Sequence, residues 1–321
     1  MNDFTWKDGD RTIRFGRGTA DTALELLGTG FVLLRTARGS GVLPLVEEAA
    51  GVVLEVPAGL VGEIAAQLLP GVQDARGASA TIVALGGGRV IDTGKALAAA
   101  TGRATAAIPT TLSAAEMTWL HRHVKGLDPP PAFVRPTVVV NDPALSASQP
   151  EPELAASAAN ALAHAVEAPA TVSASPVPSL AAAEAARLTA LAYAGAEPDR
   201  DALALAALLS GYAIDASWYG LHHVMSQTLV RLAGVGHGQA NAAMLPHTMR
   251  ALRDRGHDLV ADVALAERLA AVAGASHLVA FGVDDAALDR CADAAALRRE
   301  LANTPPAATR DELRALYAAA M

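Results

Sequence analysis

Histidine and amide side chains recur at helical spacing in the C-terminal half of the chain. In "NALAHAVEA", Asn160 and His164 are four residues apart and share one face of a helix. In "GLHHVMSQTLVRLAGVGHGQANAAMLPH", His223 and Gln227 have the same spacing, and His237 lies between two glycines where a helix can restart. Imidazoles bind metal ions and anions and exchange protons near neutral pH. This spacing predicts a metal or anion site, with packed or surface histidines as the alternative.

A second candidate site follows a predicted strand in "IVALGGGRVIDTGKAL", residues 82–97. Three glycines, Gly86 to Gly88, separate the strand from a helix-like run. Their spacing fits neither the Rossmann fingerprint, which would need glycine at Ile91, nor the P-loop, which would need a hydroxyl at Ala96. Bare backbone before a helix nevertheless suits a pyrophosphate, because helix N-termini present unpaired N–H groups. The alternative is a tight strand-to-helix turn without a ligand.

The elements that must position these residues divide into two patterns. The first part of the chain alternates strand-like and helix-like runs, which predicts a parallel sheet with helices on both faces. After about residue 146, Ala/Leu-rich helical periodicity continues to the end. We therefore predict an α/β dinucleotide-binding domain over 1–146 and an all-helical metal or substrate domain over 147–321. The predicted strands are 30–36, 51–56, 80–85, 104–109 and 137–142, with helices over 58–69 and 90–101 and a loop over 128–133.

The carboxyl ends of parallel strands are where open α/β sheets bind ligands. Both "LGGG" and "IPTTLS" stand at such ends. We therefore expect the helical domain to close over the same edge, with the active site in the cleft between the two domains.

Composition excludes several partners. The net charge of −8 and the pI near 5.6 argue against nucleic acid, whose binding needs a basic face. Cys291 is the one cysteine, so no disulfide framework exists and a reducing compartment fits. The polar N-terminus lacks a signal-peptide core, and no apolar run reaches the roughly 18 residues of a membrane span. These features predict a soluble cytoplasmic protein.

Several motifs together resemble the iron-containing alcohol dehydrogenase superfamily, whose fold is related to that of dehydroquinate synthase. The Asn at the head of "NALAHAVEA" and the doubled "HH" are most similar to the maleylacetate reductase branch. The motifs occur in the family's order along nearly the whole chain: "GGGRVIDTGK", "IPTTLSAAEMT", "NDPAL", "NALAHAVEA", "GLHHVMSQ", "GHGQANAAMLPH" and "NTPPAATRDELRALYAAA".

The resemblance implies NAD or NADP as cofactor, hydride transfer to a carbonyl group, and a homodimer. It implies that the glycines lie under the cofactor pyrophosphate, with Arg89 available to the phosphates, and that a hydroxyl-rich segment lines the ribose and nicotinamide end. In metal-dependent members an Asp and three His hold Fe²⁺ or Zn²⁺. The implied cofactor residues are Gly86, Gly87, Gly88, Arg89, Thr110, Thr111 and Ser113, and the implied metal positions are Asn160, His164, His223 and His237.

Departures from the family pattern carry their own predictions. Asn160 replaces the Asp, and a neutral amide cannot offset cation charge, so affinity for Fe²⁺ or Zn²⁺ should fall. Gln227 replaces a His and cannot relay a proton. Ala114 and Ala115 replace a usual Gly-Ser, and Arg89 a usual Ser. "LLRTARG" lacks an acid for the adenosine ribose, and its Arg38 suits a 2′-phosphate.

The sequence favours an NAD(P)-dependent reductase of the maleylacetate reductase type, acting on a small, acidic, keto or unsaturated compound. With the Asp absent, His164, His223 and His237, helped by Arg89 or Arg122, would form a partly cationic pocket. His223 or His237 would protonate or polarise the acceptor. Two other interpretations stay open: a non-redox tailoring enzyme on the same fold (lyase, dehydratase or cyclase), and a catalytically silent binding subunit.

Overall fold

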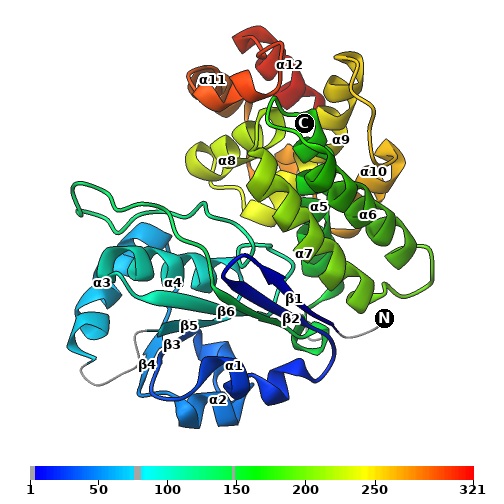
Figure 1. Cartoon of the computed structure of the whole chain (residues 1–321). Helices are drawn as coiled ribbons and strands as arrows, with labels where there is room; N and C mark the ends of the chain where they lie inside the picture. Colours follow the sequence, from blue (N-terminus) through cyan, green and yellow to red (C-terminus); the bar gives the residue numbers. More distant parts are fainter. Residues whose placement is uncertain (1–3, 76–80, 147–148) are drawn as a thin grey trace. The chain divides into compact units, whose positions relative to one another are not determined.

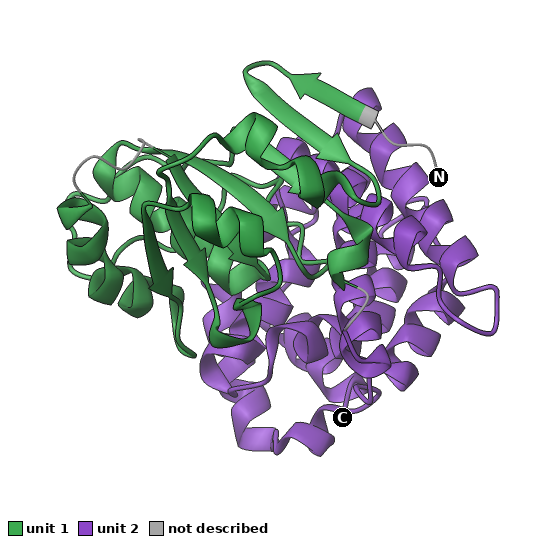
Figure 2. Ribbon diagram, turned by 90° about the horizontal axis from the view of Figure 1, so that it is seen from below, with its two compact units in different colours: residues 1–148 green, residues 149–321 purple. Residues whose placement is uncertain are grey.

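The computed structural model describes residues 4–75, 81–146 and 149–321. The chain divides into two compact units, Met1–Ser148 and Gln149–Met321 (Figure 2). Residue 147, where we placed the start of the second domain, lies outside the described residues. Among the residues that the structure does describe, every helix is too short or too polar to span a bilayer.

Unit 1 is built on a mixed seven-stranded sheet in the order β1-β2-β7-β6-β5-β3-β4 (Figure 1). All neighbouring pairs are parallel except β1 and β2. The five predicted strands are confirmed, apart from Ala80, which lies outside the described residues. The strands are β1 (Phe4–Asp8), β2 (Arg11–Phe15), β3 (Val32–Arg35), β4 (Val52–Glu55), β5 (Thr81–Gly86), β6 (Ala104–Pro109) and β7 (Val138–Asn141).

The hairpin β1–β2 adds an antiparallel pair at one edge of the predicted parallel sheet. Its sequence is polar, and β2 alternates buried and half-buried residues, with Ile13 and Phe15 facing inward. Such period-2 alternation is typical of a strand that is covered on one face. Because β2 pairs in parallel with β7, the hairpin extends the sheet beyond the strands that sequence reasoning found.

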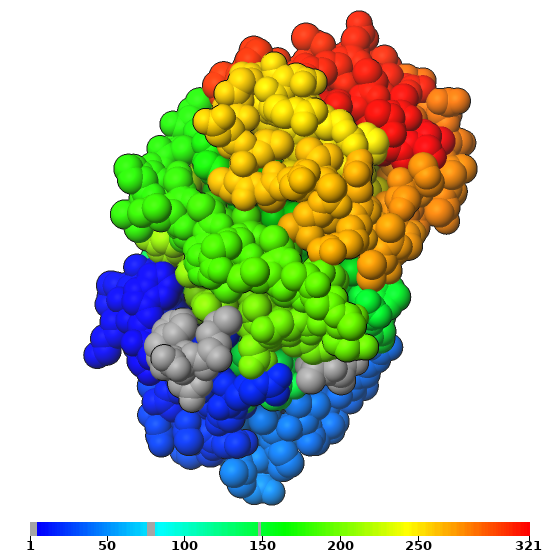
Figure 3. Space-filling model, turned by 90° about the vertical axis from the view of Figure 1, so that its right-hand side faces the viewer, coloured from blue at the N-terminus to red at the C-terminus, as the bar shows by residue number. Residues whose placement is uncertain are grey.

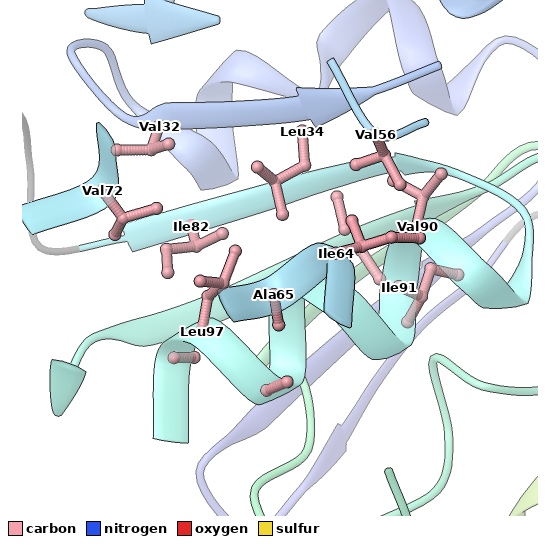
Figure 4. Packing of buried hydrophobic residues seen from close by; sticks show 14 of the residues in the cluster. Val32, Leu34, Val56, Ile64, Ala65, Val72, Ile82, Val90, Ile91 and Leu97 are labelled. Atoms are coloured by element: carbon pink, nitrogen blue, oxygen red, sulfur yellow. The ribbon is translucent and has the colours of Figure 1, made fainter. Parts of the chain in front are cut away.

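The central strands of the sheet are buried on both faces, with α3 and α4 on one side and α1 and α2 on the other (Figure 1). Along β3, Val32 and Leu34 join the cluster under α3 and α4 (Figure 4), whereas Leu33 joins the opposite cluster. This two-sided burial explains why the strands are continuous apolar runs. The helices are η1 (Thr19–Thr22), α1 (Leu24–Leu27), η2 (Ala37–Gly39), α2 (Pro44–Ala49), α3 (Val61–Asp74), α4 (Gly88–Thr101) and η3 (Pro143–Ser146).

Unit 2 is helical throughout its described residues. Helix α5 is its centre: residues 158–167 are all buried, and it packs against α6, α7, α9 and α10. Its many alanines allow these neighbours to approach closely. The C-terminal helices α11 and α12 pack together, as the orange and red surface of Figure 3 shows. The helices are α5 (Glu151–Glu167), η4 (Ala168–Ala170), α6 (Pro176–Ala192), α7 (Arg200–Ser217), α8 (Leu221–Leu232), α9 (His237–Asp254), α10 (Val263–Val272), η5 (Leu278–Phe281), α11 (Asp285–Ala296), η6 (Arg299–Asn303) and α12 (Arg310–Ala319).

Candidate functional site

The glycine turn connects β5 to α4 in unit 1. Gly86 ends the strand, Gly87 is the N-cap residue, and no side chain caps the helix that begins at Gly88. Strand β6 lies alongside, and the N–H of Thr110 donates to the carbonyl of Gly86 at 3.1 Å. The two predicted cofactor segments therefore meet at the carboxyl edge of the sheet.

The space beside each glycine is already occupied by the chain itself. A Cβ atom on Gly86 would lie 2.7 Å from Val90 Cγ2, and one on Gly87 would lie 3.0 Å from Thr111 Oγ1. A Cβ atom on Gly88 would lie 3.0 Å from the Cβ atom of Ser113. Packing thus explains why these positions are glycine. What stays open toward a ligand is the uncapped N-terminus of α4.

Arg89 is exposed at this N-terminus. Its guanidinium forms no ion pair within residues 4–75, 81–146 and 149–321. The N-terminus of α4 carries a partial positive charge and unpaired N–H groups, and the long side chain of Arg89 adds a cation beside them. These features suit a phosphate group.

Lys95, a charged residue of the helix-like run, has a structural role. Its ammonium is fully buried and donates to the carbonyls of Ala115 (3.0 Å), Thr118 (3.0 Å) and Leu120 (2.8 Å). An ion pair with Asp92 at 2.8 Å completes its surroundings. Lys95 therefore fixes the segment that follows Ser113 behind the glycine turn.

This fixed segment contains two unusual residues. Ala114 has a φ of 59°, in the left-handed region that favours glycine. Glu116 is buried, its Oε2 lacks a hydrogen-bond partner among described residues, and burial raises its pKa to about 7 although Lys95 and Arg11 oppose the rise.

The predicted histidines of unit 2 come from three helices. His164 on α5 and His223 on α8 are buried, and their ring centroids are 4.8 Å apart. His237 is the exposed first residue of α9, as its position between glycines predicted. Burial lowers the pKa of His223 to about 3 and holds that of His164 well below its usual range, and neighbouring histidines add to both effects. These two imidazoles are neutral at pH 7, so they do not supply the cationic pocket that the sequence suggested.

Glu167, which sequence reasoning did not select, fixes the orientation of His223. Its Oε2 lies 2.5 Å from His223 Nδ1, and its Oε1 accepts from the backbone N–H groups of His222 (2.6 Å) and His223 (3.4 Å). The carboxyl group thus occupies the N-terminus of α8, where negative charge is favoured. Burial raises the pKa of Glu167, while the charge of His222 and the backbone hydrogen bonds oppose the rise. The signal was available, because Glu167 follows His164 by three residues in the same motif.

With Nδ1 engaged by Glu167, His223 presents Nε2. This buried nitrogen has no hydrogen-bond partner in the part of the chain that the structure describes, and the same is true of His164 Nδ1. A buried polar atom without a partner is uncommon and indicates a place for an absent group. His223 therefore has the orientation of a histidine that contacts a ligand.

The adjacent His222 is the opposite case. Its Nδ1 lies 2.8 Å from Thr248 Oγ1, and its Nε2 lies 3.0 Å from Asn241 Oδ1. The amide of Asn241 in turn donates to the carbonyl of His237 at 2.8 Å. Both ring nitrogens are used and burial lowers the pKa of His222 to about 4, so this residue is structural.

The metal positions do not form a strong donor set. No group of three or more His, Cys, Asp or Glu side chains in the described ranges is placed to hold a metal ion. Asn160 is buried on α5 one turn before His164, and its amide oxygen is neutral. Since an Fe²⁺ or Zn²⁺ site with this amide would lack an anionic ligand, the residues present do not fit a tightly held divalent ion.

Comparison with known proteins identifies relatives of this arrangement. Residues 154–275 match the model of the Fe-containing alcohol dehydrogenase family, C-terminal. Maleylacetate reductase 1 of Rhodococcus opacus is 30% identical over 234 residues, which are 67% of this chain and 66% of that protein. The aligned segments span 31% to 66% of the lengths of the curated relatives.

Two crystal structures extend the similarity along the chain. Maleylacetate reductase from Agrobacterium tumefaciens superposes with a TM-score of 0.83 at 28% identity, covering 100% of this chain and 99% of that one. The enzyme from Rhizobium sp. strain MTP-10005 gives 0.82 at 26% identity, covering 100% and 98%.

Proposed function

We propose that this chain, which carries a domain of the iron-containing alcohol dehydrogenase family, is a nicotinamide-dependent reductase that transfers hydride to a small keto or unsaturated acid. The observation that carries the proposal is the Glu167–His223 pair. A buried carboxyl group fixes one ring nitrogen and leaves Nε2 without a partner, as a proton-transferring histidine requires. The names of the relatives support the reductase class.

The cofactor would be held at the carboxyl edge of the sheet in unit 1. The uncapped N-terminus of α4 and the side chain of Arg89 fit a pyrophosphate, and Thr111 and Ser113 offer hydroxyl groups beside the turn. NADH or NADPH, when bound, supplies the hydride. The segment after β3 offers Arg38 and no acid, so we expect NADPH to be accepted at least as well as NADH.

The protein's own contribution is placement and proton transfer. As hydride reaches the acceptor carbon, the oxygen gains negative charge and needs one proton. The Glu167–His223 pair first takes up one proton from solvent, which places a hydrogen on Nε2, and then delivers it to this oxygen; in the reverse direction the unprotonated Nε2 accepts the hydroxyl proton. Because the donor set does not fit a divalent ion, this mechanism contains no metal-dependent step.

A cofactor titration combined with a substrate panel tests the proposal. NADPH fluorescence should change saturably on binding, and the protein should consume NADPH with small keto or unsaturated acids. His223→Asn should lower kcat by about a hundredfold or more, whereas the exposed control His277→Asn should not. Binding without turnover on any acid would favour the non-redox alternative, and the absence of binding to both cofactors would refute the proposal.

A further inference from the structure

Arg298 is a fixed cation close to the start of α8. It precedes η6, and its side chain is only 16% exposed. Its Nε and Nη2 atoms each lie 3.0 Å from a different oxygen of Glu300. Hydrogen bonds from Arg298 lower the pKa of Glu300 to about 2, so the pair is ionised. A planar fork held in this way has little freedom to rotate.

The same guanidinium reaches two residues that flank His223. Arg298 Nη2 donates to the hydroxyl of Tyr219 at 3.0 Å and to Gln227 Oε1 at 3.3 Å. The ring of Tyr219 lies 6.0 Å from that of His223 between centroids. Gln227 is one helical turn after His223, so it is on the same face of α8. Arg298 therefore lies beside the histidine that we assign to proton transfer.

One charged donor in this cluster lacks an acceptor. Arg298 Nη1 is buried, and no atom of the described chain accepts a hydrogen bond from it. The half-buried Gln227 uses its Oε1 atom to accept from Arg231 Nη2 at 3.4 Å as well as from Arg298, so its amide nitrogen is the group that can donate to a ligand. Leaving a charged donor buried and unpaired costs free energy, so an acceptor is expected there.

The charge of the cluster selects the acceptor. Arg298 carries a permanent positive charge, and Glu300 engages only its Nε and Nη2 atoms. A charged guanidinium with an unused Nη1 donor, beside the amide of Gln227, suits a single carboxylate, whose two oxygens match guanidinium and amide donors.

We propose that Arg298 and Gln227 bind a carboxylate group of the substrate and so present its carbonyl carbon to the His223 side of α8. The inference rests on the proposed function and narrows the substrate to compounds that carry a carboxylate apart from the reacting carbon. It also gives a role to Gln227, which stands where the family pattern has a histidine: the amide holds the substrate instead of relaying a proton.

Direct binding tests the site without catalysis. The full chain is titrated calorimetrically with succinate and with its uncharged diamide. Succinate should bind and the diamide should not. Arg298→Lys, which keeps the charge and loses the fork, should raise the Kd for succinate by about tenfold. The matched control Arg310→Met removes a half-exposed arginine that also pairs with acids, and it should leave the Kd unchanged.

Loss of the Glu300 partner could unfold a simple truncation, so the double variant Arg298→Met/Glu300→Gln removes both charges together. Its folding is checked by near-ultraviolet circular dichroism. A folded double variant that binds succinate like the wild type would overturn the proposal, as would a wild type that binds no carboxylate. With a reducible keto acid, Arg298→Lys should raise KM more than it lowers kcat. Failure of the proposed function would appear separately, as absent NADPH consumption despite succinate binding.

Discussion

The glycine turn of unit 1 and the start of α8 in unit 2 differ in how fully the chain uses its own groups. At the turn, the position of each missing side chain is taken by Val90, Thr111 or Ser113. At α8, His223 Nε2 and Arg298 Nη1 are buried with no partner among the described residues. The glycine motif thus has a sufficient explanation in packing, whereas the polar cluster does not. The stronger evidence for a ligand therefore comes from unit 2.

The doubled histidine repeats this contrast within one helical turn. Both nitrogens of His222 are engaged by Thr248 and Asn241, while His223 is held by Glu167 on one side only. Two adjacent residues of the same type therefore have different roles, and only their hydrogen-bond partners distinguish them.

Removing the Glu167 carboxyl group should have the largest effect. Glu167→Ala leaves the backbone N–H groups of His222 and His223 and one ring nitrogen without their acceptor, and should destabilise the fold by about 3–5 kcal/mol. Glu167→Gln should cost less, because its amide oxygen can still accept from the backbone, but should lower kcat by reversing the hydrogen bond to His223 Nδ1. Urea denaturation and steady-state kinetics measure both. If the unfolding free energy of Glu167→Ala were within about 1 kcal/mol of the wild-type value, this carboxyl group would not be what holds the site together.

Glu116 is the buried polar group of unit 1 that corresponds to His223 in unit 2, because one of its carboxyl oxygens also lacks a partner among the described residues. Its pKa in the folded state is about 7, above its usual 4.5, so the folded protein holds a proton that the unfolded chain has lost. The contribution of Glu116 to stability is therefore fully present below about pH 4.5 and is lost as the pH rises to about 7, by about 3 kcal/mol in total.

Glu116→Gln should remove this loss. The difference in unfolding free energy between variant and wild type should grow from about pH 4.5 to about pH 7 and then stay constant. The buried histidines, whose pKa values are lowered, destabilise the protein as the pH falls. Their contribution is the same in both proteins, so it cancels in the difference. A difference that is flat with pH would show that Glu116 is not a buried, protonated acid.

Packing at the glycine turn can be separated from ligand binding with Gly86→Ala. The added Cβ atom would meet Val90 Cγ2 at 2.7 Å, which should cost about 1–3 kcal/mol. The double variant Gly86→Ala/Val90→Ala removes the contacts with Cγ1 and Cγ2 and keeps the one with Cβ at 2.9 Å, so the two substitutions should show a partial favourable coupling energy in a double-mutant cycle. If the changes in unfolding free energy were purely additive and Gly86→Ala alone lost affinity for NADPH, the glycines would instead be explained by ligand binding.

Ala114 should give the smallest effect. Its left-handed φ of 59° is strained for alanine, whereas glycine adopts it freely. Ala114→Gly should raise the unfolding free energy by about 0.5–1 kcal/mol, since relief of strain exceeds the extra entropy of the unfolded glycine. Thermal denaturation measures the shift, and a destabilised variant would contradict the assignment of strain to this residue.

Local patterns made much of the fold predictable. The strands β3, β5, β6 and β7 are short apolar runs buried on two faces, and their alternation with helices indicated the parallel sheet. The hairpin β1–β2 was not predicted, because its residues are mostly polar and only alternate residues of β2 are buried. Asn160 with His164, and His223 with Gln227, could be placed on common helix faces because four residues make about one turn.

Long-range partners could not be predicted from the sequence. Arg298 is 71 residues from Gln227, and no spacing rule connects them. Glu167 is 56 residues from His223, although its position beside His164 was visible. The expected positive charge of the histidines also failed, because desolvation on burial keeps His164 and His223 neutral, and burial is a property of the tertiary fold.

Hydride transfer by metal-depleted protein tests the central claim most directly. The purified chain is treated with a chelator, analysed for iron and zinc, and mixed with NADPH carrying deuterium at the transferring position and a panel of small keto acids. We predict substoichiometric metal before treatment, an unchanged rate after it, and deuterium on the reduced carbon of the product. One tightly held equivalent of iron or zinc, with activity lost on its removal, would contradict the proposal and show that Asn160 is an adequate ligand.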